Sequence, residues 1–314
     1  MSNESAVFAP QICVVGSTNI DLITRVPRLP KLGETMHGRS FHLGYGGKGA
    51  NQAVMAARLG ARVHMVARVG QDVFGQGMLA NFRAHGIDST YITTDSTHSS
   101  GVAPIFVDDQ AQNVIVIVSG ANGALSPADA QAARDAILAS TVVVCQLEVP
   151  LETTLETFRI AKSGRVKTIL NPAPAAVLPD ELLALTDIIA PNETEAEALT
   201  GSSVQTLPEA ENAARILMKR GPGAVIITLG QRGLLYIDAK TVLHVPAMQV
   251  DAVDPTGAGD AFIGSLAVFL GEGMPMQQAL WRANAAAALS VTRIGTQVSF
   301  PDRTEVDSFV ATRS

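Results

Sequence analysis

The segment Asp-Pro-Thr-Gly-Ala-Gly-Asp, residues 254–260, places two glycines and a carboxylate directly ahead of an apolar run at 261–270. Gly257 and Gly259 lack a Cβ atom, so the backbone there can approach a ligand and present bare N–H groups. The apolar run predicts a helix, and the first N–H groups of a helix have no internal partner and carry partial positive charge. This arrangement favours an anion such as phosphate. Asp260 would then lie beside the bound charge as a general base, although an ordinary helix start, with Asp260 compensating the dipole, is an equally simple interpretation.

A second glycine cluster, Gly-Tyr-Gly-Gly-Lys-Gly-Ala-Asn, spans residues 44–51 and contains G-x-G-x-x-G at Gly44, Gly46 and Gly49. Such a match alone is weak, because a dinucleotide fold needs the motif after its first strand and an acid about 20 residues on. Here the first expected strand, 12–15, lies far upstream, and Lys48 is followed by Gly rather than by the Ser or Thr of a P-loop. The cluster indicates close approach of the backbone to a small polar ligand, or simply a tight turn before a helix.

Asn19 and Asp21 are two residues apart in an extended segment, so both side chains point to one face. An amide and a carboxylate that face the same way suit sugar hydroxyls, which donate and accept hydrogen bonds. Taken alone, however, these two residues are better explained by ordinary turn capping.

Three polar residues follow predicted strands: Glu148, Asn171 and Asn192. Ligands of open α/β sheets gather at the carboxyl ends of strands, so these residues are candidates for binding. Residues 192–195, Asn-Glu-Thr-Glu, read either as a capping box or as an acidic patch that orients water around Mg²⁺. Residues 228–233 are either a plain turn or a backbone and hydroxyl shelf for a nucleotide.

The composition limits the possible functions. The chain has 314 residues, 47% of them hydrophobic and 17% charged, with a formal charge of −6, which argues against a nucleic-acid surface. Cys13 and Cys145 lie in apolar runs as expected buried thiols, the six histidines form no metal-ligand spacing, and no G-x-S-x-G elbow supports serine hydrolysis. Neither a signal peptide nor an apolar stretch long enough to cross a bilayer is evident, so we expect a cytoplasmic protein.

The elements that must position these residues alternate between strand and helix. Expected strands at 12–15, 63–69, 142–147, 167–170, 188–190 and 224–229 are interspersed with helices at 50–59, 75–85, 127–139, 151–163, 194–200 and 207–220. This order predicts an α/β fold with a parallel sheet covered on both faces. Strand material at 21–25, 35–43, 102–107 and 113–119 interrupts the rhythm and predicts a small β layer, and a hairpin is expected at 234–238 and 242–245.

Taken together, these motifs resemble those of the ribokinase-like sugar kinases, nearly from end to end. The two most specific pieces are Gly-Gly-Lys-Gly-Ala-Asn-Gln-Ala at 46–53 and Asp-Pro-Thr-Gly-Ala-Gly-Asp-Ala-Phe at 254–262. The resemblance implies a single α/β domain over 1–314, a three-layer sandwich around a mostly parallel sheet, and a small β-sheet lid built from insertions at about 17–43 and 99–120. It also implies that the lid closes over the sugar and pairs with a second lid in a homodimer.

The resemblance implies transfer of the ATP γ-phosphoryl group, with Mg²⁺, to the 5-hydroxyl of a pentose, ribose first and 2-deoxyribose as the alternative. Asp260 is then the base, and the amides of Gly257, Ala258 and Gly259 form the anion hole. The matching sugar-binding residues are Asn19, Asp21, Gly47, Lys48, Asn51 and Glu148. The matching nucleotide-binding residues are Asn192, Thr228, Gly230, Gly233 and Asn284, with Glu195 at the Mg²⁺ water shell.

A monovalent cation, normally K⁺, is also implied, and the matching positions are Asp254, Thr256, Ser290, Arg293, Gly295 and Ser299. Two other classes of protein stay open at this point. One is an NAD(P)-dependent oxidoreductase that uses the Gly44 cluster. The other is a non-catalytic sugar sensor with the same fold, against which the intact Asp260 motif argues.

Overall fold

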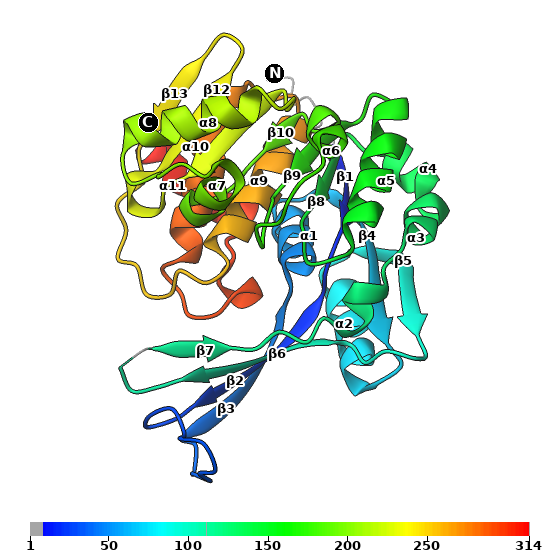
Figure 1. The fold of residues 1–314 in the computed structure, drawn as a ribbon, viewed down its shortest axis with the longest axis vertical. Coiled ribbons are helices and arrows are strands. Elements are labelled where there is room, and N and C mark those ends of the chain that lie inside the picture. Colours follow the sequence, from blue (N-terminus) through cyan, green and yellow to red (C-terminus); the bar gives the residue numbers. More distant parts are fainter. Residues whose placement is uncertain (1–8, 111, 314) are drawn as a thin grey trace, which may run out of the picture.

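A nine-stranded sheet forms the centre of the computed structural model, which describes residues 9–110 and 112–313 (Figure 1). Its spatial order is β13-β12-β11-β10-β9-β8-β1-β4-β5, and the pairs from β11 to β5 are parallel while β11-β12 and β12-β13 are antiparallel. The strands are β1 (Gln11–Val15), β4 (Arg62–Gly70), β5 (Asp88–Asp95), β8 (Val142–Cys145), β9 (Lys167–Leu170), β10 (Ile188–Ile189), β11 (Ala224–Thr228), β12 (Leu234–Asp238) and β13 (Val242–Val245).

Helices cover both faces of this sheet and complete three layers. One face packs against α1 (Lys48–Arg58), α2 (Val73–Ala84), α9 (Ala258–Gly271), α10 (Met276–Ser290) and α11 (Arg303–Ala311). The other packs against α3 (Pro127–Ala132), α4 (Arg134–Ala139), α5 (Leu151–Ser163), α6 (Asp180–Ala184), α7 (Glu193–Thr200) and α8 (Leu207–Met218). Short 3₁₀ turns are η1 (Gly120–Ala124), η2 (Gly230–Arg232) and η3 (Gln297–Ser299).

Alternation along the central strands explains the two cores. On β1, Ile12 and Val14 face the α9 side while Cys13 and Val15 face the α5 side, and all four are fully buried. A strand buried on both faces is apolar throughout, which is the pattern of a parallel sheet between helices. The predicted α/β fold with a mostly parallel sheet is confirmed.

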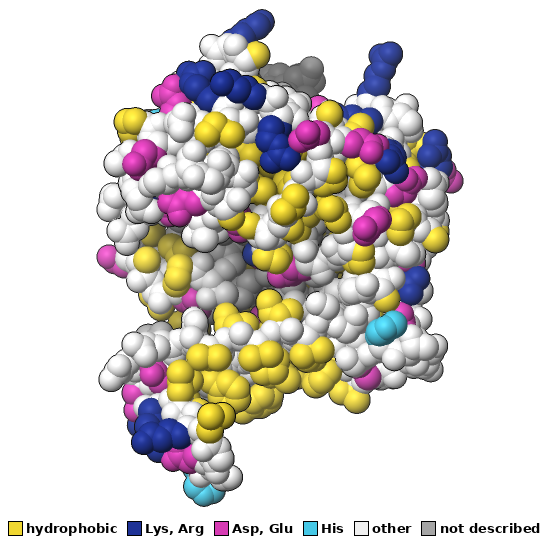
Figure 2. Space-filling view, in the orientation of Figure 1, with side chains coloured by type: hydrophobic (Ala, Val, Ile, Leu, Met, Phe, Trp, Pro, Cys, Tyr) yellow, Lys and Arg dark blue, Asp and Glu magenta, His cyan; other side chains and the backbone are white. Residues whose placement is uncertain are grey.

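A four-stranded sheet projects from the large one, in the order β3-β2-β6-β7 (Figure 1). Its strands are β2 (Asn19–Arg25), β3 (Ser40–Gly46), β6 (Gly101–Val107) and β7 (Asn113–Ile115). Strands β2 and β3 lie between β1 and α1 in the sequence, and β6 and β7 lie between β5 and η1. Because β2 follows the end of β1 and β6 follows the end of β5, this smaller sheet, hereafter the lid sheet, borders the carboxyl ends of central strands. A hollow separates it from the main body (Figure 2).

Two sequence expectations need correction, and some elements of the structure had no prediction. The helix expected at 127–139 is two helices that meet at Ala133, whose φ of −90° and ψ of 9° leave the helical range. The strand expected at 35–43 begins only at Ser40, because its partner β2 ends at Arg25 and earlier residues have nothing to pair with. Strand β5 and helix α11 had no prediction; β5 carries polar residues on an exposed sheet edge, which hides its strand pattern.

Candidate active site

Helix α9 supplies the start of the site. Gly257 is its N-cap with φ of +82°, a left-handed conformation that glycine adopts readily, and residues 260–270 are buried. The predicted Gly-rich turn and helix are therefore present. Asp260 lies in the first helical turn and is only 7% exposed.

A cavity of about 170 Å³ opens at this helix start and collects residues from five segments of the chain. From the predicted site it is lined by Lys48, Asn192, Glu195, Thr228, Gly257, Ala258, Gly259 and Asp260. Asn171, Ala173, Ala190, Pro255 and Ile263 complete the lining. A larger hollow of about 610 Å³ between β13 and α10 contains none of the predicted residues.

The carboxylate of Asp260 accepts a hydrogen bond at each oxygen. Asn51 Nδ2 donates to Oδ2 and Gln52 Nε2 donates to Oδ1, both at 2.9 Å. Burial raises the pKa of Asp260, the charge of Lys48 and the two amide donors oppose that rise, and the charge of Glu148 adds to it. A buried carboxylate with a raised pKa that remains fully hydrogen-bonded is a suitable proton acceptor.

Lys48, at the first position of α1, is the positive charge of this cavity. Burial alone would lower its pKa, but the carboxylates of Asp260, Glu148 and Glu195 outweigh that effect and raise the pKa. The ammonium group therefore stays protonated among three acids and can contact transferred phosphate.

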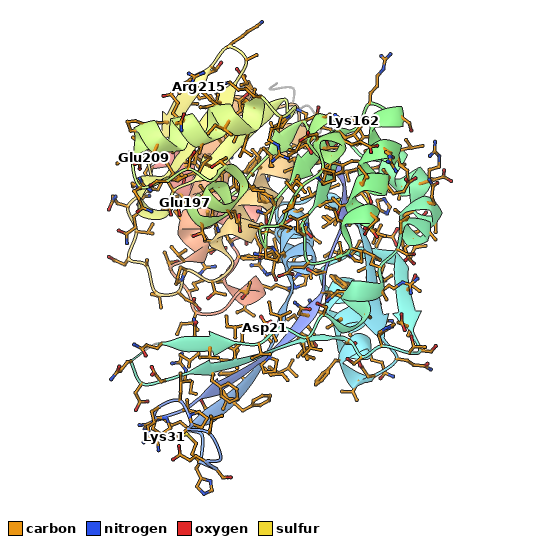
Figure 3. All side chains as sticks on the ribbon, in the orientation of Figure 1. Asp21, Lys31, Lys162, Glu197, Glu209 and Arg215 are labelled. Carbon is orange, nitrogen blue, oxygen red and sulfur yellow. The ribbon has the colours of Figure 1, made fainter. Side chains whose placement is uncertain are left out.

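The residues predicted for the sugar meet at the base of the lid sheet. Asn19 and Asp21 lie on β2, and Asp21 faces the main body from the lid sheet (Figure 3). Burial and the charges of Glu148 and Asp260 raise the pKa of Asp21 to about 7. Gly46 pairs with Asn19 on the neighbouring strand, and a Cβ on Gly46 would come within 2.3 Å of Asp21 Oδ2. Gly47 is the N-cap of α1 with φ of +87°.

Glu148, after β8, ties this sugar-side group to the start of α1. Its Oε2 accepts from Ser17 Oγ at 2.5 Å and from the backbone N–H of Lys48 at 3.0 Å. Asn122 Nδ2 donates to Asn19 Oδ1 at 2.8 Å, which fixes the orientation of the Asn19 amide. Ser17 and Asn122 had no prediction, and single residues of these types carry no distinctive sequence signal.

The predicted nucleotide side is brought together only in part. Asn192 and Thr228 lie on neighbouring segments joined by a β-bridge, and both line the cavity. Glu195 and Asn192 form the capping box that the sequence allowed, since Glu195 Oε2 accepts from the Asn192 N–H at 2.8 Å. The remaining predicted residues, Gly230, Gly233 and Asn284, lie outside the cavity lining, and Asn284 Nδ2 donates to the carbonyl of Pro246 at 2.8 Å.

The predicted cation positions meet where Asp254 joins two loops. Its Oδ1 accepts from the Thr256 N–H at 3.0 Å and its Oδ2 from the Gly295 N–H at 2.9 Å. Ser290 and Ser299 are buried, with hydroxyls that donate to the carbonyls of the residues three positions earlier. The Arg293 guanidinium pairs with Glu305, so its side chain points away from any cation.

Gln52 and Gln146 are buried members of the site that sequence reasoning missed. Gln146 Nε2 donates to Gln52 Oε1 at 2.6 Å, and Gln52 Nε2 also donates to Asn171 Oδ1 at 3.1 Å. One signal existed: Gln146 is a polar residue at the end of the apolar run 142–145, next to the strand end that carries Glu148. Ala258 also differs from expectation, because its N–H donates to the Pro255 carbonyl at 3.2 Å.

Two features are absent from residues 9–110 and 112–313. No three His, Cys, Asp or Glu side chains of these residues gather in a group able to hold a metal ion. Within the same ranges, no helix combines the length and apolar character that a membrane crossing requires.

Comparisons with known proteins define the class of this site. Residues 9–303 match the pfkB family of carbohydrate kinases, and the chain belongs to that family. It is 44% identical over 300 residues to a ribokinase of Mus musculus, covering 93% of this chain and 92% of the relative. It is 42% identical over 301 residues to a deoxyribokinase of Salmonella typhi, covering 96% and 98%.

A solved structure of Arabidopsis thaliana ribokinase, complexed with ribose and ATP, superposes with a TM-score of 0.90 at 32% identity over 96% of this chain and 99% of that one. The oxidoreductase alternative is therefore wrong. The glycine cluster on which that alternative depended begins at Gly44 in β3 of the lid sheet, whereas a dinucleotide fold needs it after a strand of the central sheet.

Proposed function

We propose that this protein is a ribose kinase, which transfers the γ-phosphoryl group of ATP to the 5-hydroxyl of D-ribose. The observation that carries the proposal is the position of Asp260, buried at the start of α9 in one cavity with Gly257, Gly259 and Lys48. Membership in a carbohydrate kinase family and the relatives named ribokinase support the same reaction. The reaction needs one base and a site for developing negative charge, and the cavity offers both.

In this mechanism Asp260 accepts the proton of the 5-hydroxyl as that oxygen attacks the γ-phosphorus, the bond from the γ-phosphorus to the bridging oxygen breaks, and ADP leaves. The amides of the anion hole, Gly257, Ala258 and Gly259, face the transferring phosphoryl group, and Lys48 balances its charge. Because the Ala258 N–H is already engaged with Pro255, the two glycines carry most of this contact. Mg²⁺ bound with ATP would neutralise phosphate charge.

We assign the sugar to Asn19, Asp21, Gly47, Lys48, Asn51 and Glu148, and the nucleotide to Asn192, Thr228, Gly230, Gly233 and Asn284. Glu195 fits the water shell of Mg²⁺, since each of its buried oxygens accepts one hydrogen bond from Asn192 and keeps a lone pair for a metal-bound water. An indirect role of this kind does not require a cluster of acidic ligands.

We also propose a K⁺ site formed by Asp254, Thr256, Ser290, Arg293, Gly295 and Ser299. The oxygen-rich loops joined by Asp254 suit a hard monovalent cation, with Arg293 limited to its backbone carbonyl because its side chain pairs with Glu305. A bound cation would fix the loop beside the anion hole. Buried, unpaired Cys13 and Cys145 support a reducing, cytoplasmic setting.

The lid sheet supports a homodimer. On the face turned away from Asn19 and Asp21, its strands present Phe41, Leu43, Val114 and Val118, each between 42% and 60% exposed. Figure 2 shows apolar side chains gathered along this part of the molecule. Such a band favours association with a second copy.

The experiment that tests the function is a coupled ADP-release assay with D-ribose and 2-deoxyribose, run in K⁺ and in Na⁺. Asn122 occupies Asn19 Oδ1, so the Asn19 amide nitrogen is the donor left for a sugar hydroxyl, which favours ribose. We expect a higher kcat/KM for ribose and a higher rate in K⁺. Preference for 2-deoxyribose would establish the alternative, equal rates in the two salts would remove the cation site, and no turnover of any sugar would reject the kinase assignment.

A further inference from the structure

We propose that Gln52 is a positioning residue for the base, and that a fixed chain of amide hydrogen bonds through Gln52 holds Asp260 in its proton-accepting form. The proposal rests on the phosphoryl transfer proposed above. Gln52 is completely buried on α1, one residue after Asn51, and its amide joins Gln146, Asn171 and Asp260.

The order of donors and acceptors in this series of hydrogen bonds is set at one end by a group that can only accept a hydrogen bond. Asn171 Nδ2 donates to the backbone carbonyl of Ala190 at 3.0 Å, so Asn171 Oδ1 must face Gln52. Gln52 must then present its N–H₂ group, and its two hydrogens go to Asn171 Oδ1 and Asp260 Oδ1. A backbone carbonyl can accept a hydrogen bond but cannot donate one, so the Ala190 carbonyl determines the orientation of the Asn171 and Gln52 amides.

Gln146 contacts Gln52 from the other side, and because Gln146 Oε1 is buried without a hydrogen-bond partner among the described residues, Gln52 orients Gln146 and not the reverse. Its Nε2 donates to Gln52 Oε1 at 2.6 Å, and Gln146 itself is completely buried. If the Gln52 amide turned over, two acceptors would face each other at Asn171. Buried unpaired groups of this kind cost about 1–3 kcal/mol each, which keeps one orientation.

The consequence falls on Asp260. Asp260 Oδ1 accepts from Gln52 and Oδ2 accepts from Asn51, and each oxygen keeps a second lone pair for the proton of the substrate. Gln297 donates to Asn51 Oδ1 at 3.0 Å, which orients the Asn51 amide. An amide N–H binds an ionised carboxylate more strongly than a neutral acid. Both oxygens therefore favour the ionised carboxylate. This opposes burial and the negative charges of Asp21, Glu148 and Glu195 around the site, while Lys48 acts in the same direction as the amides.

The test compares Gln52→Met and Gln52→Glu with the unaltered enzyme, using D-ribose turnover as a function of pH. Methionine keeps the length of the side chain but donates nothing, so we expect kcat to fall at least about tenfold with the KM for ribose within about threefold. The acid limb of kcat/KM should move to higher pH. Glutamate adds a carboxyl next to Asp260, so its acid limb should move further, by about one pH unit or more.

Gln131→Met, the same change at an exposed glutamine of α3, is the control and should leave both kcat and the acid limb unchanged. Ribose affinity by calorimetry shows that each variant is folded. If Gln52→Met does not fold, Gln146→Met keeps Gln52 but removes the hydrogen bond that Gln52 Oε1 accepts. A smaller shift of the acid limb in the same direction is then expected. An unmoved acid limb in a folded variant refutes the positioning role, whereas an inactive unaltered enzyme would instead refute the proposed function.

Discussion

As the proposed base, Asp260 depends on its neighbours for its affinity for a proton. A carboxyl of ordinary pKa is a weak base near neutral pH, and burial raises the pKa here while amide donors keep the carboxylate ionisable. Asp260→Asn cannot accept the proton, so we expect kcat to fall by about 10²–10⁴-fold with ribose affinity largely kept. Steady-state turnover and calorimetric ribose binding check this prediction. Near-normal kcat in the Asn variant would show that another group is the base.

Asp21 links the same charge cluster to stability. Its folded pKa of about 7 lies above the ordinary value of 3.8, so the folded state holds a proton that the unfolded state loses. The contribution of Asp21 to stability is therefore fully present below pH 3.8 and is lost as pH rises through 7. We expect Asp21→Asn to raise the melting temperature at pH 8 more than at pH 5 while it weakens ribose binding. An equal shift at both pH values would contradict this.

Residues that act through local motifs were predictable, and residues that act through distant contacts were not. Asp260, Gly257 and Lys48 belong to short segments whose glycines and charges indicate phosphate chemistry. Gln52 contacts Asp260, which is 208 positions away in the sequence, and Gln146, which is 94 positions away. A glutamine by itself suggests neither contact. Only the fold brings such amides together.

At the scale of elements, the first turn of α9 and the first turn of α1 use glycine for different reasons. A Cβ on Gly259 would meet nothing within 4 Å, whereas a Cβ on Gly49 would come within 2.7 Å of the Ser17 backbone. Gly259→Ala should therefore leave stability unchanged or slightly higher and weaken ATP binding, since the open space is for the ligand. Gly49→Ala should cost about 1–3 kcal/mol. Thermal unfolding and ATP titration of both variants separate the two roles, and a destabilised Gly259→Ala would refute the distinction.

Elements with a strong apolar pattern were predicted to within a few residues, as at β9, α5 and β12. Strand β5 was missed because it lies at the sheet edge, where most of its residues are partly or fully exposed and polarity no longer alternates. The division of 127–139 into α3 and α4 was missed because alanine favours helix on both sides of the break. Both helices pack against α5, but α3 also contacts β4 whereas α4 contacts β1, and the local sequence does not contain these contacts.

At the scale of the whole molecule, the lid sheet has two faces with different partners. Asn19 and Asp21 point to the cavity side, while Ile20 and Leu22 alternate to the other side and align with Tyr45 and Leu43 of β3. A free sheet of four strands with one apolar face exposed to water is poorly stabilised by itself. A second copy that covers this face would both bury it and hold the lid sheet over the sugar.

The predicted homodimer can be broken on that face alone. Val114→Asp places a charge on β7, where the side chain is 42% exposed, and desolvating it in an interface is unfavourable. Val177→Asp, at a valine that is 94% exposed and outside the lid sheet, is the matched control. We expect light scattering to give a dimer mass for the unaltered protein and the control, and a monomer mass with a higher KM for ribose for Val114→Asp. A monomeric unaltered protein, or a Val114→Asp variant that stays dimeric, would mean that the apolar face of the lid sheet is not the interface.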